Sequence, residues 1–356
     1  MGTLSQDVEL DATSATDLPP AAERRRERHF WVRAVVVAGL GVVIATLLGS
    51  ALLSISHAPA PHHVPLGYVD NTVGAAGARE ALSEKAGDAL TLVSYDDRDA
   101  AVTGIRRLDV YGALVVGAGG VELLKSTAAS PQVAAALTAL VTSATAGSTA
   151  PRVTEITPLP AGDSAGGGLA VLLQVVILVG TIGAVGLGRL VPRYRANWAR
   201  GELPVLFLVL YALCAGATIA TLARAFGVGD HLHYAELALS LALVNLAVTA
   251  SISAVVSLIG SAGAAVGGVL YFLLGAPISG AATALPMMPA AWRDFGQALP
   301  PGAGATLLRR VLYFPDAPLG TPVLTLALYA IAGALVLGIV NAVAGAHHRN
   351  SLADLP

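Results

Sequence analysis

The side chains that could carry chemistry are few in this chain, and their spacing excludes the common catalytic classes. ATP hydrolysis needs a loop of the form Gly-x-x-x-x-Gly-Lys-Ser/Thr, and no Gly-Lys pair occurs in the sequence. Histidines gather at His57, His62 and His63 and again at His231 and His233, but neither group has the ligand spacing of a structural zinc site. The sequence therefore predicts a protein that is not an enzyme and has no cofactor or metal site of its own.

A basic loop holds the densest group of functional side chains. It lies between two apolar segments, Leu169–Leu190 and Leu203–Phe226, and combines arginines with a tyrosine and a tryptophan. Arginines beside apolar segments set the orientation of membrane helices, and the same side chains could form a docking helix for a cytoplasmic partner. The sequence leaves both interpretations open. The residues are Arg189, Arg193, Tyr194, Arg195, Trp198 and Arg200.

A second unusual segment, Ala284–Ala317, is too polar to span a membrane and too apolar for an ordinary loop. Its pattern predicts two short amphipathic helices that are hinged at Pro300-Pro301-Gly302. The second helix would gather its leucines and Val311 on an apolar face and point Arg309 and Arg310 elsewhere. The candidate functional residues of this hairpin are Trp292, Arg293, Pro300, Pro301, Gly302, Arg309 and Arg310.

The elements that must position these residues are long apolar segments. Hydrophobic residues make up 55% of the chain and charged residues only 12%, against about 25% charged residues in a soluble domain. A helix of roughly 20 apolar residues crosses a bilayer core, and five segments meet that length, whereas the segment Ala262–Ile278 is shorter and rich in glycine. The six are Ala34–Ser56, Leu169–Leu190, Leu203–Phe226, Leu237–Ile259, Ala262–Ile278 and Val323–Ala346.

The distribution of arginines predicts the orientation of these segments. Arginines precede the first segment, fill the loop between the second and third, and follow the last as Arg349, whereas the loop between the third and fourth contains Asp230 and Glu236 without a basic residue. Cytoplasmic loops carry the Lys/Arg excess. With six spans, all three basic segments lie on the cytoplasmic side, so both termini are cytoplasmic and the large insert after the first span is outside. A five-span arrangement would place Arg349 outside.

The insert between the first and second spans alternates strand-like and helix-like segments, which predicts an α/β domain. A linker rich in proline and glycine, Pro158–Gly168, leads back to the membrane. The predicted strands are Leu66–Asp70, Leu90–Tyr95, Val110–Val116 and Arg152–Thr157, and the predicted helices are Ala78–Ala86, Asp97–Arg107, Val121–Ala128 and Pro131–Ala144.

The chain is therefore expected to be a polytopic α-helical membrane protein of six transmembrane helices, with an extracytoplasmic α/β domain between helices 1 and 2. A cytoplasmic tail of residues 1–30 precedes the first helix at 31–56. The external domain covers 57–166, the five-helix membrane domain covers 167–346 with the external hairpin at 284–317, and a second cytoplasmic tail covers 347–356.

The spans contain almost no charged residues, which argues against transport driven by protons or sodium. Gln174 and Asn245 are uncharged and could form hydrogen bonds between helices. Small residues recur at spacings that permit close helix approach, either within the chain or at a dimer interface, and both alternatives stay open. These residues are Gly180, Gly183, Gly186, Gly263 and Gly267.

Four features resemble the ABC type-2 permeases, in particular the bacterial subgroup with an extracytoplasmic domain after the first span, which includes relatives of the phage infection protein. They are the six-span layout with its insert, the strand Gly67–Asn71, the linker Pro158–Gly166, and the segment from Leu285 to Arg309 before the last span. The resemblance covers most of Trp31–Ala346 and is topological more than a match of motifs.

The resemblance implies a permease subunit of an ATP-driven exporter in the bacterial inner membrane. In such exporters a second permease chain forms a dimer with the first, separate cytoplasmic ATPase subunits dock beneath, and a hairpin before the last span gates the outer mouth. Here the docking segment would be Arg189–Pro204 and the gate Leu285–Phe314. The partners would be the lipid bilayer, the second permease and the ATPase, and no nucleic acid. The competing hypothesis is a membrane-anchored scaffold or receptor whose external domain binds an envelope or extracellular ligand.

Overall fold

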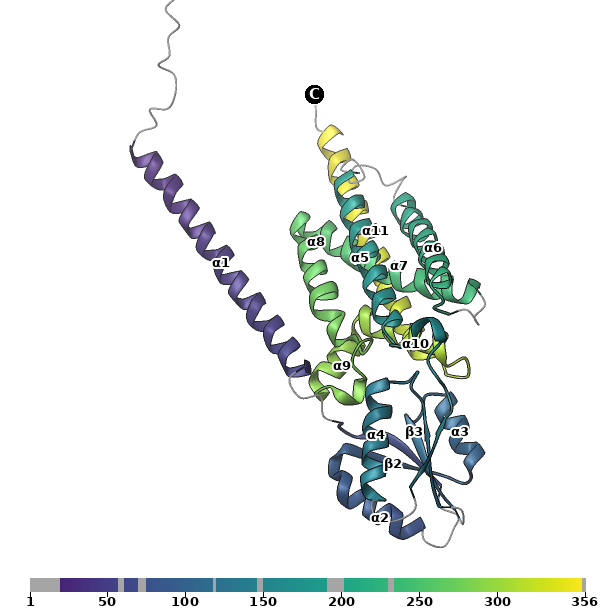
Figure 1. Ribbon diagram of the computed structural model, residues 1–356. Coiled ribbons are helices and arrows are strands. Elements are labelled where there is room, and N and C mark those ends of the chain that lie inside the picture. The colour runs from purple at the N-terminus through teal and green to yellow at the C-terminus, as the bar shows by residue number, and fades with distance from the viewer. Residues whose placement is uncertain are drawn as a thin grey trace, which may run out of the picture. The chain divides into compact units, whose positions relative to one another are not determined.

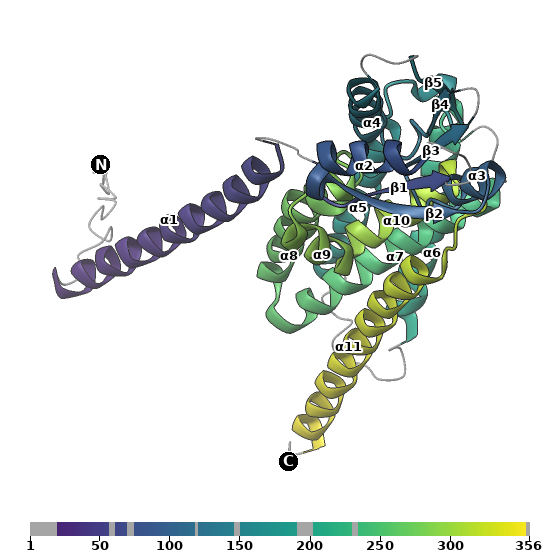
Figure 2. The ribbon, with the colours of Figure 1, turned by 90° about the horizontal axis from the view of Figure 1, so that it is seen from below.

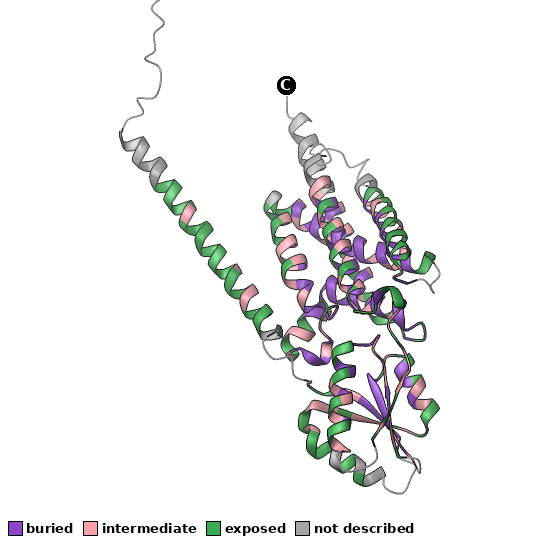
Figure 3. Cartoon of the chain, viewed as in Figure 1, coloured by how far each residue is buried: buried purple, intermediate pink, exposed green. Residues whose placement is uncertain are grey.

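The computed structural model describes residues 20–56, 61–69, 75–117, 120–145, 150–190, 202–229 and 234–353. The chain divides into two compact units, Met1–Ser50 and Ala51–Pro356. The first unit contains most of helix α1 (Pro20–Ser56), a single continuous helix. Figure 3 shows the described part of α1 without a buried residue, and its apolar stretch is long enough to cross a membrane.

The α/β domain of the second unit is built on a sheet of five strands. They are β1 (Val64–Val69), β2 (Leu90–Tyr95), β3 (Gly112–Gly117), β4 (Gly120–Lys125) and β5 (Arg152–Glu155), in the order β2-β1-β3-β4-β5. Strands β3 and β4 pair antiparallel, and the other neighbours pair parallel. Figures 1 and 2 show the strands as one twisted layer with helices on its two sides.

Three helices cover the sheet, and each of the two faces has its own core. Helices α2 (Ala75–Ala86) and α4 (Pro131–Ala144) pack on one face together with Leu66, and helix α3 (Arg98–Arg106) packs on the other with Leu124. The starts of α3 and α4 are capped by side chains. The Asp97 carboxylate accepts a hydrogen bond from Ala100 N at 2.7 Å, and the Ser130 hydroxyl accepts one from Val133 N at 3.2 Å. The predicted alternation of strands and helices is confirmed, apart from one element.

The prediction of a helix at Val121–Ala128 is wrong, because these residues form β4 and the turn that follows it. The segment contains Glu122 and two leucines, which favour helices in isolation. Pairing with β3 overrides that preference, with Val121 opposite Val116 and Leu124 opposite Ala113. Leu123 and Leu124 point to opposite faces and are both fully buried, which is the side-chain pattern of a central strand covered on both sides.

The membrane part of the second unit consists of α5 (Gly168–Leu190), α6 (Glu202–Ala225), α7 (Tyr234–Ile259) and α11 (Gly320–Ala353). With α1, these are five helices long and apolar enough to cross a membrane, so the polytopic α-helical class is confirmed. Helix α8 (Ser261–Gly268) continues as a π-helical stretch over Val269–Gly275, and its apolar helix is shorter than a typical span of roughly 20 residues. The six-span count therefore stays a prediction.

Glycines let the other helices approach the backbone of α7. A Cβ added at Gly216 of α6 would lie 2.4 Å from Ala238 O, and one at Gly333 of α11 would lie 2.5 Å from the backbone of Ala250. Gly263 of α8 meets the α7 backbone in the same way, at 2.7 Å. Of the glycines predicted to permit close approach, all but Gly186 contact another helix of the same chain. They are Gly180, Gly183, Gly263 and Gly267.

One polar side chain forms a hydrogen bond between two spans. The amide of Asn245, fully buried on α7, donates to Val176 O of α5 at 3.1 Å. The predicted interhelical bond is therefore confirmed for Asn245. Gln174 lies instead on an exposed face of α5.

Two alanine substitutions test the packing around α7. Gly216→Ala is expected to destabilise the protein by about 1–3 kcal/mol, because the added methyl group overlaps backbone atoms of α7 that cannot move independently. Gly186→Ala is the matched control. Nothing lies within 4 Å of the added methyl group there, so the change should be neutral or stabilising by up to about 1 kcal/mol through helix propensity. Thermal melting in lipid nanodiscs measures both, and equal shifts would contradict the packing argument.

Candidate functional site

The hairpin before the last membrane helix consists of α9 (Ala290–Ala298) and α10 (Pro300–Tyr313). The chain reverses at Leu299, whose backbone is extended, with φ −89° and ψ 154°. Pro300 and Pro301 occupy the first turn of α10, where their fixed φ suits a helix and their missing N–H groups have no intrahelical partner to lose. The predicted pair of helices is confirmed, but the hinge lies one residue before the expected position.

Two glycines hold this hairpin together by close approach. A Cβ at Gly302 would lie 2.1 Å from Gly296 O, and a Cβ at Gly296 would lie 2.1 Å from Ile278 O. Side-chain hydrogen bonds add to the contact, because Thr306 donates to Gln297 at 2.7 Å and Gln297 donates to Ser279 O at 2.8 Å. The two helices and the turn at Pro277–Ser279 therefore form one packed group.

The expectation that Arg309 points away from the core is wrong. Its side chain is 7% exposed, and its Nη2 donates to Gly280 O at 2.7 Å and to Ala281 O at 3.3 Å. Every residue of α10 except Thr306 and Arg310 is buried, because this helix is enclosed by protein and has no face left for solvent or lipid. The segment around Gly280 turns through a left-handed conformation and leaves carbonyl groups that need donors. Arg309 supplies them.

The end of α10 is bound to the linker that leads from the α/β domain to the membrane. Tyr313 donates to Asp163 Oδ2 at 3.1 Å, and Gly168 N donates to the same carboxylate at 3.0 Å. Gly168 is the first residue of α5, so the carboxylate lies where a helix N-terminus favours a negative charge. Burial and the neighbouring Asp163 both raise the pKa of Tyr313, which keeps its hydroxyl protonated as a donor.

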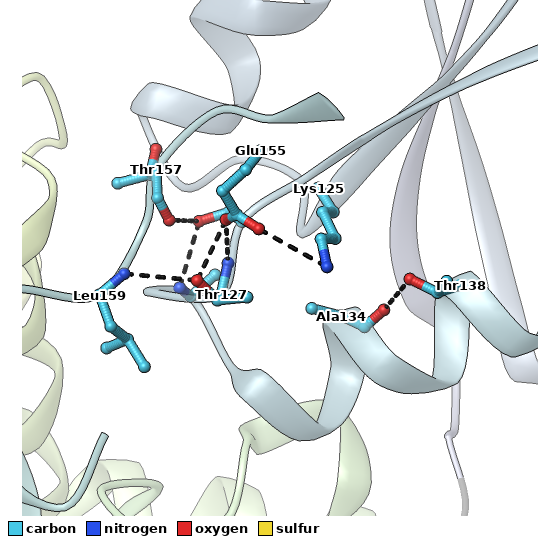
Figure 4. A network of polar contacts seen from close by, with 9 residues as sticks. Lys125, Thr127, Ala134, Thr138, Glu155, Thr157 and Leu159 are labelled. Atoms are coloured by element: carbon cyan, nitrogen blue, oxygen red, sulfur yellow. Dashed lines mark hydrogen bonds and ion pairs between the residues drawn. The ribbon is translucent and has the colours of Figure 1, made fainter. Parts of the chain in front are cut away.

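The linker is also fixed at its start, as Figure 4 shows. The Glu155 carboxylate accepts hydrogen bonds from Thr127 N at 2.7 Å and Thr127 Oγ1 at 3.1 Å, and it lies 3.7 Å from the Lys125 ammonium. The same Thr127 hydroxyl accepts from Leu159 N at 3.3 Å. The linker is therefore held to the α/β domain at Leu159 and to α10 at Asp163.

Asp163 and Arg309 are the two buried charged side chains in the described part of the chain. Tyr313 donates to the Asp163 carboxylate, and the buried Tyr111, which immediately precedes β3, lies near Arg309. Burial lowers the pKa of the Arg309 guanidinium, which nevertheless stays protonated because its ordinary pKa exceeds about 12. We call Asp163, Arg309, Tyr313 and Tyr111 the junction cluster, because they join the α/β domain, the linker and the hairpin.

A small cavity adjoins the junction cluster. Its volume is about 30 Å³, enough for a water molecule and too small for an organic substrate. It is lined in part by Ser130, Pro131, Gly166, Ala281, Arg309 and Tyr313.

The remaining predicted residues of the hairpin lie away from the junction cluster. Trp292 is half-buried on α9 and packs against the core, and Arg293 pairs with its neighbour Asp294 at 3.1 Å. The Nη1 group of Arg310 donates to Pro318 O. The hairpin thus divides into a buried half around Arg309 and a half around Trp292 and Arg293 that is only partly covered.

The predicted docking loop lies almost wholly outside the described residues. Arg193, Tyr194, Arg195, Trp198 and Arg200 belong to the segment 191–201, and Arg189 lies in the last turn of α5 with a side chain that is not described. Of the two histidine groups in the sequence, His62 and His63 are described, and the described residues include no group of His, Cys, Asp or Glu suited to a metal ion.

Sequence reasoning did not identify Asp163, Tyr313 or Tyr111 as functional candidates. The sequence could have indicated Asp163, because it is an acidic residue in a Pro/Gly-rich linker just before an apolar helix. No sequence pattern indicates the tyrosines. The role of Tyr313, for example, depends on a contact with Asp163 across 150 residues of sequence.

No family model matches the chain, and no curated protein matches it. The geometry of the junction cluster and the sequence pattern are therefore the basis for a functional proposal.

Neighbouring arginines of α10 provide a test of the junction cluster. Arg309→Met should destabilise the protein by about 3 kcal/mol, because it leaves two buried carbonyl groups without their donor. Arg310→Met should cost less than about 1 kcal/mol, because its guanidinium is only half-buried and bonds one carbonyl. Thermal melting of the purified full chain in nanodiscs compares the two, and a smaller effect at Arg309 than at Arg310 would contradict the assignment.

Proposed function

We propose that this chain is the permease subunit of an ATP-driven exporter that works as a dimer with separate ATPase subunits. The observation that carries the proposal is the continuous connection from the predicted docking loop to the hairpin through α5. The last turn of α5 enters the docking loop, and its first residue, Gly168, donates to Asp163, which also binds Tyr313 of α10. A displacement of the docking loop would reach the hairpin along this helix.

Helix α5 is suited to transmit such a displacement. Its 23 residues make it about 35 Å long, which is roughly the thickness of a bilayer core. It packs on α7 by close contact, because a Cβ at Gly180 would lie 2.9 Å from the Val248 side chain. Packed helices move as rigid bodies more readily than they deform. Motion at one end of α5 is thus expected to reappear at the other.

The hairpin is suited to act as an outer gate because it is packed on the membrane helices yet tied to the α/β domain. Helix α10 contacts α5, α7 and α11, and Gly304 brings its backbone against Val244 of α7. Through Tyr313 and Asp163 it is bound to the linker, which Thr127 holds to the α/β domain. A shift of α10 would therefore also shift the external domain.

The lack of buried charged side chains in the described spans favours transport driven by a partner ATPase over transport driven by an ion gradient. In the described part of α5, α6, α7 and α11, the buried polar side chains are the uncharged Asn245, Thr249 and Ser253. Carriers driven by ion gradients use ionisable residues inside the membrane. The full sequence also lacks a phosphate-binding loop, so ATP would be hydrolysed by a partner chain.

The proposal includes a six-span topology in the bacterial inner membrane, with both termini cytoplasmic and the α/β domain outside. It can be tested with single cysteines introduced into a Cys214→Ser background, since Cys214 is the one cysteine of the chain. A membrane-impermeant maleimide should label Ser94→Cys, at an exposed position of β2, in intact cells. It should label Ser5→Cys and Ser351→Cys only after permeabilisation. Labelling of Ser351→Cys in intact cells would instead support five spans.

The export proposal is tested by purifying the tagged chain from its native membrane and identifying the proteins that accompany it. A stoichiometric nucleotide-binding subunit is expected. Recovery of an envelope protein without such a subunit would contradict the proposal and favour the competing function, a membrane-anchored scaffold or receptor.

The docking assignment is tested by replacing Arg193, Arg195 and Arg200 with Glu. The ATPase should then be lost from the purified complex, because a basic docking surface becomes acidic. The matched control reverses Arg24, Arg25 and Arg26, a basic cluster on the same proposed side of the membrane, and should retain the ATPase. Cysteine labelling of both variants establishes that the topology is unchanged, and retention of an active ATPase by the loop variant would exclude this loop as the coupling site.

A further inference from the structure

An apolar pocket lies within the α/β domain, between helices α2 and α4. Its volume is about 350 Å³, which falls within the range of roughly 300–1,000 Å³ for small-molecule sites. The floor is formed by Val64 and Leu90, the first residues of β1 and β2, and α4 forms one wall with Val133, Leu137 and Leu140. These side chains are all aliphatic, so the pocket suits a flexible apolar chain better than a sugar or a nucleotide.

One positively charged side chain lies beside this pocket. Lys85, the basic residue in the last turn of α2, lines the pocket and donates to Ser143 O at the end of α4. The ammonium group has three donors, and a single bond to a carbonyl leaves it able to bind an anionic headgroup. Apolar walls with one cation at the edge are complementary to a molecule with one chain and one negative charge.

The pocket also lies beside segments that belong to the membrane part of the chain. Pro61 lines the pocket, and the next residue, His62, donates through its backbone N to Pro286 O at 2.8 Å. Pro286 precedes α9 of the hairpin. At the start of the α4 wall, Ser130 and Pro131 line the small cavity together with Ala281 and Arg309. The pocket therefore lies next to the hairpin and the turn before it.

We propose that the pocket between α2 and α4 binds the acyl chain of a single-chain anionic amphiphile, such as a fatty acid, with Lys85 at its headgroup. The aliphatic lining excludes water from the chain, and burial of apolar surface drives binding. The proposal concerns a ligand site on the external domain and does not depend on the export proposal, because its test measures binding alone.

The site is tested with the full chain in nanodiscs and a photoactivatable medium-chain fatty acid, followed by mass spectrometry of the labelled peptides. Adducts are expected in residues 131–144 and 85–90. Ala139→Trp should reduce this labelling by about tenfold or more, because the indole occupies the pocket in place of the chain. Ala135→Trp is the matched control, since Ala135 is an exposed alanine of the same helix that does not line the pocket, and it should leave the labelling unchanged.

The role of Lys85 is tested by comparing the fatty acid with the corresponding fatty alcohol. Lys85→Gln should weaken labelling by the acid about tenfold, because a charge-assisted hydrogen bond is lost, and should not affect the alcohol. Lys85→Arg should restore labelling by the acid.

Three results would overturn the proposal. They are equal labelling of the Ala139→Trp and Ala135→Trp variants, an equal response of both probes to Lys85→Gln, and adducts confined to the membrane helices. The last result would also be expected if the pocket accommodates an apolar peptide side chain instead of an acyl chain.

Discussion

The close approach of helices to the backbone of α7 is the constraint on which the membrane part of this structure depends. Lipid offers little hydrophobic drive for helices to associate, so contact between them relies on van der Waals packing of small residues. Here Gly216, Gly263 and Gly333 bring α6, α8 and α11 against α7. The packing leaves 61% of the most apolar stretch of α7 buried within the protein. Within it, the Asn245 side chain donates to Val176 O of α5 and accepts from Thr249 of α7.

The enclosed hairpin follows from this arrangement. Helix α10 packs on α5, α7 and α11, and the turn at Pro277–Ser279 and Gly280 cover it further. Such enclosure would leave the carbonyl groups of Gly280 and Ala281 unpaired. Arg309 of α10 donates hydrogen bonds to both. A buried guanidinium is costly unless it is hydrogen-bonded, so the bonds from Arg309 to Gly280 O and Ala281 O hold α10 and this turn together as one unit. Tyr313 and Asp163 extend the unit to the linker and to the first residue of α5.

The sequence predicted much of the fold because the patterns involved are local. The apolar segments around α1, α5, α6, α7 and α11 exceed the length that a helix needs to cross a bilayer. Asp97 and Ser130 mark the starts of α3 and α4 by their capping chemistry. The prediction was wrong at β4, where pairing with β3 outweighed the helix preference of Glu122 and its neighbouring leucines. It placed the hinge of the hairpin at the prolines, although prolines in a first turn extend a helix as readily as they interrupt one.

The class of protein, the limits of most elements and the lack of a phosphate-binding loop can be read from the chain alone, because composition, periodicity and capping act over neighbouring residues. The burial of Arg309, the hydrogen bonds from Tyr313 and Gly168 to Asp163, and the apolar pocket between α2 and α4 depend on the folded arrangement. These features join segments far apart in the chain. The helical pattern of α10 shows which side chains share a face, but it cannot show that the opposite face is also covered. Because other segments cover that face, Arg309 is a buried donor and not an exposed cation.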